Sequence, residues 1–411
     1  MRYGIDNFYI DDCQGNNTVI PLGGRNLIVC GDNGAGKTQF LNKLFECLKV
    51  YFKKGLQSEY EFYTDELKRR IFELDKAREE GLDCTSREES IASTEKQIAR
   101  TNSFRPEIIN IDEVREAVDN HELFLRYFPA TRQANIPNDG TIASQFILNN
   151  EYASHRQNNN DFSLDSALLF ERYLVSIWNY SLLKKGNGDL DEYHKFLKKI
   201  NNIEQDLKLL FEDDSLSLSF DLEVLSILIH QENKKPYSLR HLSSGFSAIL
   251  AIYADLLMKS EITNQPKSEL QGIVLIDEID VHLHVTLQRK IFSFFSTSYP
   301  FIQFIVSTHS PFVIQSVSDS VIFNLSTHEQ MEDLSYFSYS SIVKGLLGEE
   351  IISQKLLKHV EELKELTDKK KFNFEFHHIV TVLDKNVLYL DSRSRAALAL
   401  AKNTLLDFNE D

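Results

Sequence analysis

The segment from Gly31 to Thr38 has the residue types and the spacing of a loop that binds phosphate groups. It follows the pattern G-x-x-x-x-G-K-T and ends in Lys37 and Thr38. In such a loop, glycines let backbone N–H groups turn toward a phosphate, the lysine reaches the β- and γ-phosphate oxygens, and the hydroxyl binds Mg²⁺. We therefore predict a site for a nucleoside triphosphate, ATP, together with Mg²⁺. The candidate nucleotide-binding residues of this loop are Gly31, Asp32, Asn33, Gly34, Ala35, Gly36, Lys37, Thr38 and Gln39.

Two adjacent carboxylates, Asp277 and Glu278, come directly after the apolar run 271–276. An apolar strand that ends in Asp-Glu is common by itself, but together with a phosphate loop it is the Walker B arrangement. We expect Asp277 to bind Mg²⁺ directly or through water, as Thr38 does. Phosphoryl transfer depends mainly on positioning and charge stabilisation, so Glu278 is the candidate base that orients and deprotonates the attacking water.

A second apolar run, 301–306, ends in Ser-Thr-His-Ser-Pro and brings His309 to the end of a strand. A single histidine at a strand end is more often structural, but this position also suits a sensor of the γ-phosphate. We count His309 with Glu278 and Lys37 as candidate catalytic residues. His282 and His284 follow the acidic pair, but no cysteine or further histidine nearby supports a zinc site.

A second candidate anion site lies at Ser243, Ser244 and Gly245, before an expected helix over 247–258. Two hydroxyls and a glycine at a helix N-terminus can bind an anion. The simpler alternative is an ordinary helix cap, and this segment alone does not exclude it. Because Lys37 already accounts for one triphosphate, a second anion site in the same chain suggests a ligand shared between two chains.

These residues require a sheet whose strands end at one edge. Short strands are expected over 3–10, 18–22, 26–30 and 123–128, and a helix over 37–53. The last of these strands ends near Arg132 and Gln133, at the position where α/β folds place ligand contacts. Charged helical segments over 59–100 predict either a helical hairpin or a pair of surface helices, and the residues leave both open.

We expect an α/β fold of the P-loop type with a mixed sheet and a helical lobe, a short helical-hairpin insertion and a small C-terminal α+β extension. The predicted divisions are an ATPase lobe over 1–55, a helical, coiled-coil-like insertion over 56–118, the rest of the ATPase over 119–345 and the C-terminal extension over 346–411. In that extension an amphipathic helix is expected over 351–366 and a strand-like segment over 372–390.

Composition limits the function classes. The chain has 411 residues, 42% of them hydrophobic, so it can bury a large core. It has no run of 18 apolar residues and no apolar N-terminal segment, and its four cysteines have no paired spacing. We therefore expect a cytoplasmic protein without a membrane contact. The net charge of −16 argues against a broad nucleic-acid surface, although a local basic stripe remains compatible with it.

Taken in this order, the four motifs resemble the ABC-type ATPase head of the SMC, RecF and OLD families, over roughly residues 1–55 and 120–325. Segments 275–284 and 303–311 are similar to stand-alone bacterial ATPases of anti-phage systems, such as the ATPase subunits of the Septu and PARIS systems. Two positions depart from the pattern, namely Phe246, where Glu or Gln is usual, and Val285, where proline is usual.

The resemblance implies that two heads form a homodimer around two ATP molecules. Each ATP would be bound by the Walker motifs of one chain and, in trans, by Ser243, Ser244 and Gly245 of the other. Higher oligomers are compatible with this unit. By the same likeness Gln133 is a candidate for the glutamine near Mg²⁺, with Gln145 as a rival.

Three functions remain open. The first is an ATP-gated sensor or scaffold in phage defence that holds and activates a separate effector, with a nuclease as the expected kind. The second is a RecF-like or SMC-like DNA repair ATPase, and the third a free-standing nuclease or toxin with its active site in the C-terminal segment. Residues 386–393 resemble the first strand of the Toprim domain in OLD nucleases, but about 20 residues follow, too few for the remaining acidic strands. We therefore favour the first function.

Overall fold

The computed structural model of the chain forms two compact units, Met1–Ile342 and Val343–Asp411. All predicted nucleotide-site residues belong to the first unit. No helix in the described part of the chain combines the length and the apolar composition that crossing a membrane requires. The residues described are 3–11, 17–52, 58–134, 136–137, 142, 150, 165–221, 223–334, 337, 339–345, 354–387 and 390–410.

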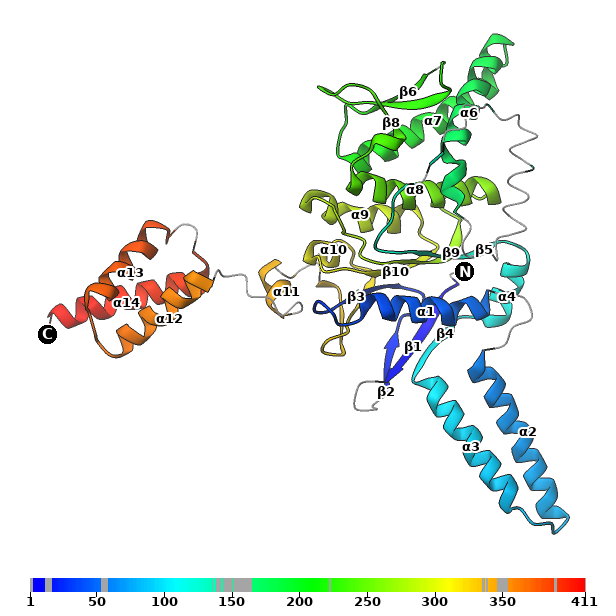
Figure 1. Cartoon of the computed structure of the whole chain (residues 1–411), viewed down its shortest axis with the longest axis horizontal. Helices are drawn as coiled ribbons and strands as arrows, with labels where there is room; N and C mark the ends of the chain where they lie inside the picture. Colours follow the sequence, from blue (N-terminus) through cyan, green and yellow to red (C-terminus); the bar gives the residue numbers. More distant parts are fainter. Residues whose placement is uncertain are drawn as a thin grey trace. The chain divides into compact units, whose positions relative to one another are not determined.

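A six-stranded mixed sheet lies at the centre of the first unit (Figure 1). Its strand order is β12-β11-β3-β10-β9-β5, and all neighbours are parallel except the antiparallel pair β11–β12. Strands buried on both faces need almost continuous apolar sequence, which is why the central ones could be predicted. The strands are β3 (Asn26–Cys30), β5 (Leu123–Phe128), β9 (Gln271–Ile276), β10 (Ile302–Ser307), β11 (Ser320–Asn324) and β12 (Glu329–Glu332).

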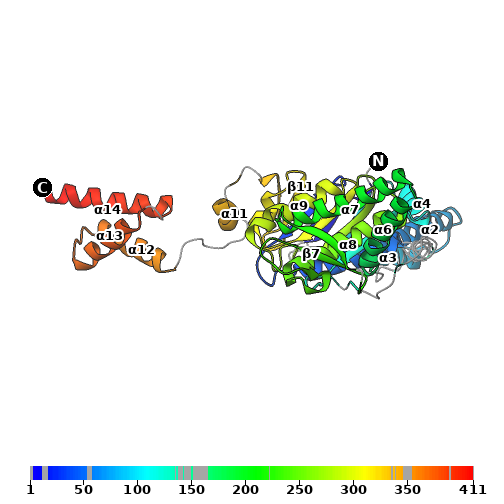
Figure 2. The same ribbon diagram turned by 90° about the horizontal axis from the view of Figure 1, so that it is seen from above.

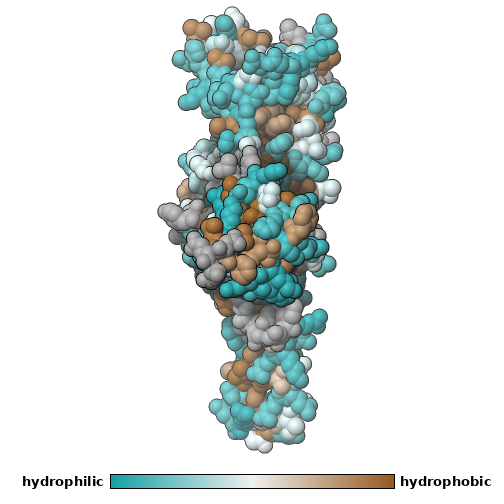
Figure 3. Space-filling view, turned by 90° about the vertical axis from the view of Figure 1, so that its left-hand side faces the viewer, coloured by the Kyte–Doolittle hydropathy of each residue, from teal (hydrophilic) through white to brown (hydrophobic). Residues whose placement is uncertain are grey.

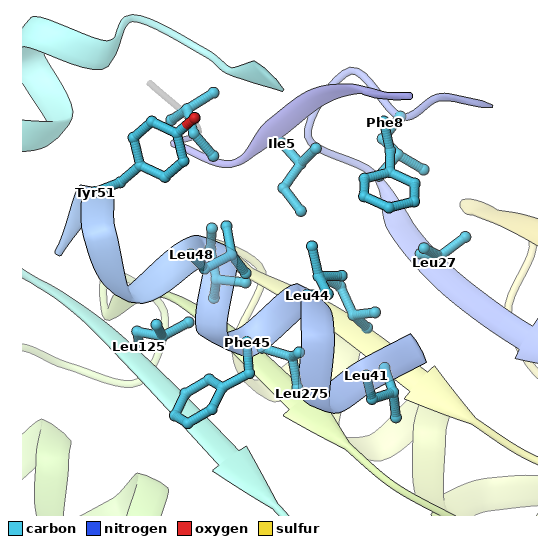
Figure 4. Close-up of a cluster of buried hydrophobic side chains, with 14 of the residues drawn as sticks. Ile5, Phe8, Leu27, Leu41, Leu44, Phe45, Leu48, Tyr51, Leu125 and Leu275 are labelled. Atoms are coloured by element: carbon cyan, nitrogen blue, oxygen red, sulfur yellow. The ribbon is translucent and has the colours of Figure 1, made fainter. Parts of the chain in front are cut away.

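Helix α1 (Lys37–Tyr51) and a small antiparallel sheet cover one face of the central sheet. Apolar residues of α1 recur at steps of three and four, so one side of the helix is buried. Figure 4 shows Leu41, Leu44 and Leu48 among side chains of β1, β5 and β9. The small sheet has the order β2-β1-β4 and consists of β1 (Ile5–Asp11), β2 (Asn17–Pro21) and β4 (Phe104–Ile108).

The opposite face carries the aromatic side of α9 (Val285–Ser298) and the helix α8 (Ser244–Thr263). Phe304 of β10 has ring contacts with Phe292 and Phe295 of α9, each with centroids 6.3 Å apart. Figure 1 shows a helical lobe beyond these helices, on the side away from α1, and Figure 2 shows this lobe from above. The lobe and its connections comprise η1 (Ser166–Leu169), α6 (Phe170–Gly186), α7 (Leu190–Phe211), β6 (Ser217–Asp221), β7 (Ser226–His230), β8 (Tyr237–Ser238) and η2 (Leu239–His241). The short α10 (Pro311–Gln315) follows β10.

A buried ion cluster joins this lobe to the sheet. Asp255 of α8 is fully buried and pairs with Arg126 of β5 at 3.1 Å, and it accepts a hydrogen bond from the backbone N–H of Ser166 at 2.8 Å. Arg126 also contacts Asp165 at 3.3 Å. Burial raises the pKa of Asp165, and the nearby Asp255 raises it further, whereas Arg126 lowers it. The two carboxylates therefore need the positive charge of Arg126 between them.

Replacing Asp255 with alanine is expected to cost about 3–5 kcal/mol of stability, because it leaves the buried Arg126 only the partly exposed Asp165 as a partner and removes the acceptor of the Ser166 N–H. The measurement is the thermal unfolding midpoint of the purified variant. The control is Glu192→Ala, which removes an exposed ion pair with Lys195 and should cost less than about 1 kcal/mol. Equal midpoints for the two variants would contradict the structural role of the cluster.

Helices α2 (Glu59–Glu79) and α3 (Thr85–Asn102) form a hairpin. Of the two alternatives that the sequence left open, the helical hairpin is the one observed. The arms contact each other through Arg78 and Glu88, 2.9 Å apart. Both helices are described along their whole length, and they bury only Leu74, Ala77 and Thr94. The hairpin extends from the small sheet in Figure 1, and its visible face is mostly hydrophilic in Figure 3.

The predicted insertion boundary at 118 is wrong. The insertion ends near residue 103, because β4 pairs with β1 in the small sheet and α4 (Ile111–Asp119) packs into the same core as α1. Pro106 lies inside β4, and proline argues against a strand unless the strand lies at a sheet edge, where its missing N–H is tolerated. β4 is such an edge strand.

The described residues of the second unit form helices and no strand, so the expected α+β character is wrong for them. The strand-like segment 372–390 is largely helix α13 (Phe374–Lys385), which begins where the Asn373 side chain accepts a hydrogen bond from the N–H of Phe376. Its apolar residues recur at helical spacing and face Leu363 and Leu398 in one core. The unit's other helices are α12 (Gln354–Asp368) and α14 (Ser392–Glu410), and α11 (Tyr339–Gly345) spans the unit boundary.

The resemblance of 386–393 to a Toprim strand is not supported by the described residues. Residues 388 and 389 lie outside them. On either side are a turn and the start of α14, where Asp391 accepts hydrogen bonds from the N–H groups of Arg393 and Ser394.

Candidate nucleotide site

The predicted site residues meet at the carboxyl edge of the central sheet. The phosphate loop follows β3, the acidic pair follows β9, His309 follows β10, and Arg132 follows β5. In open α/β sheets this edge is where ligands bind. Parallel pairing of neighbouring strands brings together residues that are almost 280 positions apart in the chain.

The phosphate loop has the backbone that its glycines predict. Gly34 and Gly36 have φ angles of 84° and 89°, and Gly31 has 137°. A Cβ atom at Gly31 would lie 3.0 Å from Oγ of Ser326, whose hydroxyl accepts a hydrogen bond from the N–H of Asp32 at 2.9 Å. α1 starts at Lys37, directly after the loop, so its N-terminal end adds positive potential to the site.

Lys37 lies inside the loop and is almost fully buried. Its ammonium donates hydrogen bonds to the carbonyl oxygens of Gly31 and Asp32 at 2.9 and 3.0 Å, and it lies 3.5 Å from Nδ1 of His309. Burial lowers the pKa of Lys37, while neighbouring acidic groups, including Glu278 and Asp277, raise it. The ammonium is therefore poorly solvated, which favours its binding to a phosphate.

Asp277 is the best-held carboxylate of the site. It is 1% exposed, and its two oxygens accept hydrogen bonds from the hydroxyls of Thr38 at 2.7 Å and Ser307 at 2.5 Å. Thr38 and Asp277 thus present two oxygen atoms to one point, as a shared Mg²⁺ requires. In the described residues, no group of three or more His, Cys, Asp or Glu side chains is placed to hold a metal ion by itself.

Glu278 has an unusual backbone. Its φ angle is +46°, in the left-handed region that residues with a side chain seldom adopt. Its N–H donates to Oγ of Ser307 at 2.7 Å, and its side chain is half-buried. This conformation turns the chain sharply at the end of β9, immediately after Asp277.

Arg132, expected from the sequence only as a residue at the ligand-binding end of a strand, contacts the acidic segment through its side chain. Its guanidinium donates to the carbonyl oxygens of Asp277, Glu278 and Ile279 at 2.7, 3.1 and 3.4 Å. Burial lowers its pKa to about 10, although the acidic residues around it raise the value. The neighbouring Gln133 is exposed, and its rival Gln145 lies outside the described residues. Only the position of Arg132 after β5 gave a sequence signal.

The N-terminal end of α8, which begins at Ser244 and not at the predicted residue 247, is accessible from outside the chain. Ser243 and Ser244 are exposed, and Ser243 occupies the N-cap position without a side-chain cap hydrogen bond. Gly245 is buried, and a Cβ atom there would lie 2.5 Å from the carbonyl oxygen of His282. Phe246, one of the two departures from the expected pattern, packs against Phe211 of α7 with ring centroids 4.5 Å apart.

The sheet order and the phosphate loop define a P-loop nucleotide-binding protein. Residues 27–315 match the AAA_21 family, described as "AAA domain, putative AbiEii toxin, Type IV TA system", and the chain belongs to this family. The match includes all four predicted motifs. The expected α/β fold with a mixed sheet and a helical lobe, and the expected place among P-loop ATPases, are confirmed.

Curated relatives include the "Retron Vc95 probable ATPase" of Vibrio cholerae serotype O1 biovar El Tor. It is 25% identical, and the match covers 72% of this chain and 68% of that protein. "Septu protein PtuA" of Bacillus mycoides (strain KBAB4) is 31% identical over 39% of this chain and 20% of its own length. The "Retron Ec83 probable ATPase" of Escherichia coli is 31% identical over 36% of this chain and 28% of its own length. The expected likeness to the Septu ATPases is therefore confirmed.

Among solved structures, an SMC head bound to the C-terminal winged-helix domain of ScpA matches 81% of this chain and 99% of its own, at 10% identity and a TM-score of 0.36. CbiO1 of Clostridium perfringens, part of the ABC transporter complex cbiONQ, matches 88% and 98%, at 11% identity and a TM-score of 0.35. Both scores are below 0.5, and the fold assignment rests instead on the sheet order and the phosphate loop.

Proposed function

We propose that this chain is an ATPase of the ABC head type, which acts as the sensor or scaffold subunit of a phage-defence complex and holds a separate effector, a nuclease, until it is triggered. The observation that carries the ATPase part is the meeting of Lys37, the Thr38–Asp277 pair and Glu278 at one sheet edge. These groups supply the three needs of phosphoryl transfer, namely charge neutralisation, a metal site and a base.

In this proposal the phosphate loop and Lys37 bind the β- and γ-phosphates. Thr38 and Asp277 are the residues that would hold Mg²⁺, which neutralises charge on the phosphates when bound. Glu278 accepts a proton from the attacking water, and His309, next to Lys37, senses the γ-phosphate. Gln133 remains the proposed glutamine near the metal. The direct test is release of phosphate from ATP by the purified chain, with and without Mg²⁺.

The defence role is supported by the names of the relatives, since two are retron proteins and one is a Septu protein. The match covers only 20% of the Septu protein and 28% of the Retron Ec83 protein. The partners and substrates of this chain are therefore proposed. Co-purification with the product of a neighbouring gene tests for the effector. Binding of DNA that stimulates ATP hydrolysis, without any protein partner, would favour the RecF-like alternative.

We further propose that Ser243, Ser244 and Gly245 act in trans, on ATP bound by a second copy of the chain. Their support is the exposure of both serines and the lack of a cap hydrogen bond from Ser243. Ser244→Arg is expected to retain ATP binding but to lose ATP-driven dimerisation and hydrolysis, because a long side chain blocks the shared site. Light scattering with and without ATP measures the first effect.

The control for this variant is Ser86→Arg, at an exposed position of the hairpin, which should dimerise normally. Full dimerisation of Ser244→Arg with ATP would return the segment to an ordinary helix cap. Mixing Lys37→Ala with Ser244→Arg chains adds a second readout, since each mixed dimer keeps one shared site with Lys37 and Ser244 intact.

A further inference from the structure

The Arg132 guanidinium holds together two segments that are far apart in the chain. Nη1 donates to the carbonyl oxygens of Pro129 and Asp277, and Nη2 donates to those of Glu278 and Ile279. The four distances lie between 2.7 and 3.4 Å. A planar guanidinium fixes both the direction and the spacing of the groups it binds, so it is suited to hold a particular backbone conformation.

The backbone it holds belongs to the proposed base. Glu278 has a φ of +46°, which is unfavourable for a residue with a Cβ atom and persists only where surrounding contacts enforce it. Arg132 donates hydrogen bonds to the carbonyl oxygens of Asp277, Glu278 and Ile279, which are those of this residue and of its two neighbours in the chain. Ser307 holds the same residue from the other side, through the N–H of Glu278. The direction of the Glu278 side chain therefore depends on Arg132.

The same arginine segment is tied to α8. The N–H of Ala134, two residues after Arg132, donates to Oγ of Ser247 at 3.0 Å. Ser247 lies in the first turn of α8, three residues after the exposed Ser244. Gly245 of α8 lies close to the segment that follows Glu278, because a Cβ atom at this position would lie 2.5 Å from the carbonyl oxygen of His282.

We infer that Arg132 is a positioning residue, which holds Glu278 in its left-handed conformation and couples that conformation to the first turn of α8. This inference rests on the proposed ATPase function. Its consequence is that a partner bound at Ser243 and Ser244 affects the base of the same chain through Ser247, Ala134 and Arg132. The arginine itself donates to backbone carbonyls, so it needs no contact with the nucleotide.

The test compares Arg132→Met with Arg132→Lys, Ser247→Ala and a matched control, Arg25→Met. Arg25 also donates to backbone carbonyls, those of Pro21 and Leu22, but it precedes β3 and so lies at the opposite sheet edge.

A misplacement of the base by about 1 Å can cost about 100-fold in rate. We expect Arg132→Met to lower kcat for ATP by about 10- to 100-fold, with the Kd of a fluorescent ATP analogue unchanged. Arg132→Lys and Ser247→Ala should lie between this variant and the wild type, and Arg25→Met should match the wild type.

The decisive readout is the double variant Arg132→Met/Glu278→Gln. If Arg132 acts through Glu278, the double variant hydrolyses ATP no more slowly than Glu278→Gln alone. A further loss in the double variant, or a nucleotide affinity that falls together with kcat, would overturn the inference. Should Arg132→Met fail to fold, Ser247→Ala carries the same test in combination with Glu278→Gln.

Failure of the inference and failure of the proposed function give different results. A wild-type chain that binds ATP but does not hydrolyse it, with Glu278→Gln equally inactive, contradicts the proposed function. A wild-type chain that hydrolyses ATP, with Glu278→Gln inactive and Arg132→Met fully active, contradicts only the role of Arg132.

Discussion

Glu278→Gln is expected to bind ATP with wild-type affinity and to hydrolyse it about 100- to 10,000-fold more slowly, the usual contribution of a general base. The amide keeps the size and the hydrogen-bonding shape of the carboxylate but cannot accept the proton of the attacking water. Because Glu278 is held by its backbone, through Arg132 and Ser307, the substitution leaves the architecture of the site intact. Bound ATP then persists, and the proposed dimer stays closed.

Phosphate formed in an acid-quenched single turnover separates this chemical effect from slow product release. Glu89→Gln, at an exposed position of the hairpin, is the control for loss of a carboxylate elsewhere and should behave as the wild type. Unchanged turnover in Glu278→Gln would remove this residue from the mechanism and indicate another base. A loss of ATP binding in the same variant would instead indicate that Glu278 contributes to the metal site.

The sequence predicted the site well wherever a local pattern carries the geometry. The phosphate loop, Asp277 and Glu278 were found because each directly follows an apolar run, and the parallel sheet brings the ends of these runs together. The strands 26–30 and 271–276 have the predicted bounds. Buried parallel strands are easy to recognise because both of their faces must be apolar.

Prediction failed where a long-range contact decides the local structure. β4 contains Pro106, and its pairing with β1 across the hairpin insertion is what makes it a strand. Phe374–Lys385 is rich in aromatic and branched residues, yet it is a helix because its apolar face closes a three-helix core. The sequence places Arg132 at the ligand-binding edge but does not predict its role, because its partners are backbone carbonyls of a segment about 145 residues away, which no side-chain motif encodes.

Lys37→Ala is expected to weaken ATP binding by at least about 100-fold. The wild-type ammonium would give charge-assisted hydrogen bonds to phosphate oxygens, each worth about 1.5–3 kcal/mol, and about 1.4 kcal/mol corresponds to a tenfold change in affinity. Its removal also leaves Asp277 and Glu278 without the cation that offsets their charge beside the phosphates. The affinity loss therefore has two causes that act in the same direction.

Titration with a fluorescent ATP analogue measures this effect, and Lys43→Ala provides the control on the same helix. Lys43 is exposed and lies over the ring of Phe104 at 4.1 Å, outside the phosphate loop, so its loss should leave the affinity unchanged. Lys37 also donates to two loop carbonyls, so the thermal midpoint of the variant without nucleotide must be compared with that of the wild type. A folded Lys37→Ala chain that binds ATP as tightly as the wild type would refute the nucleotide site. Residues 31–38 contain no lysine or arginine besides Lys37 that could replace its charge.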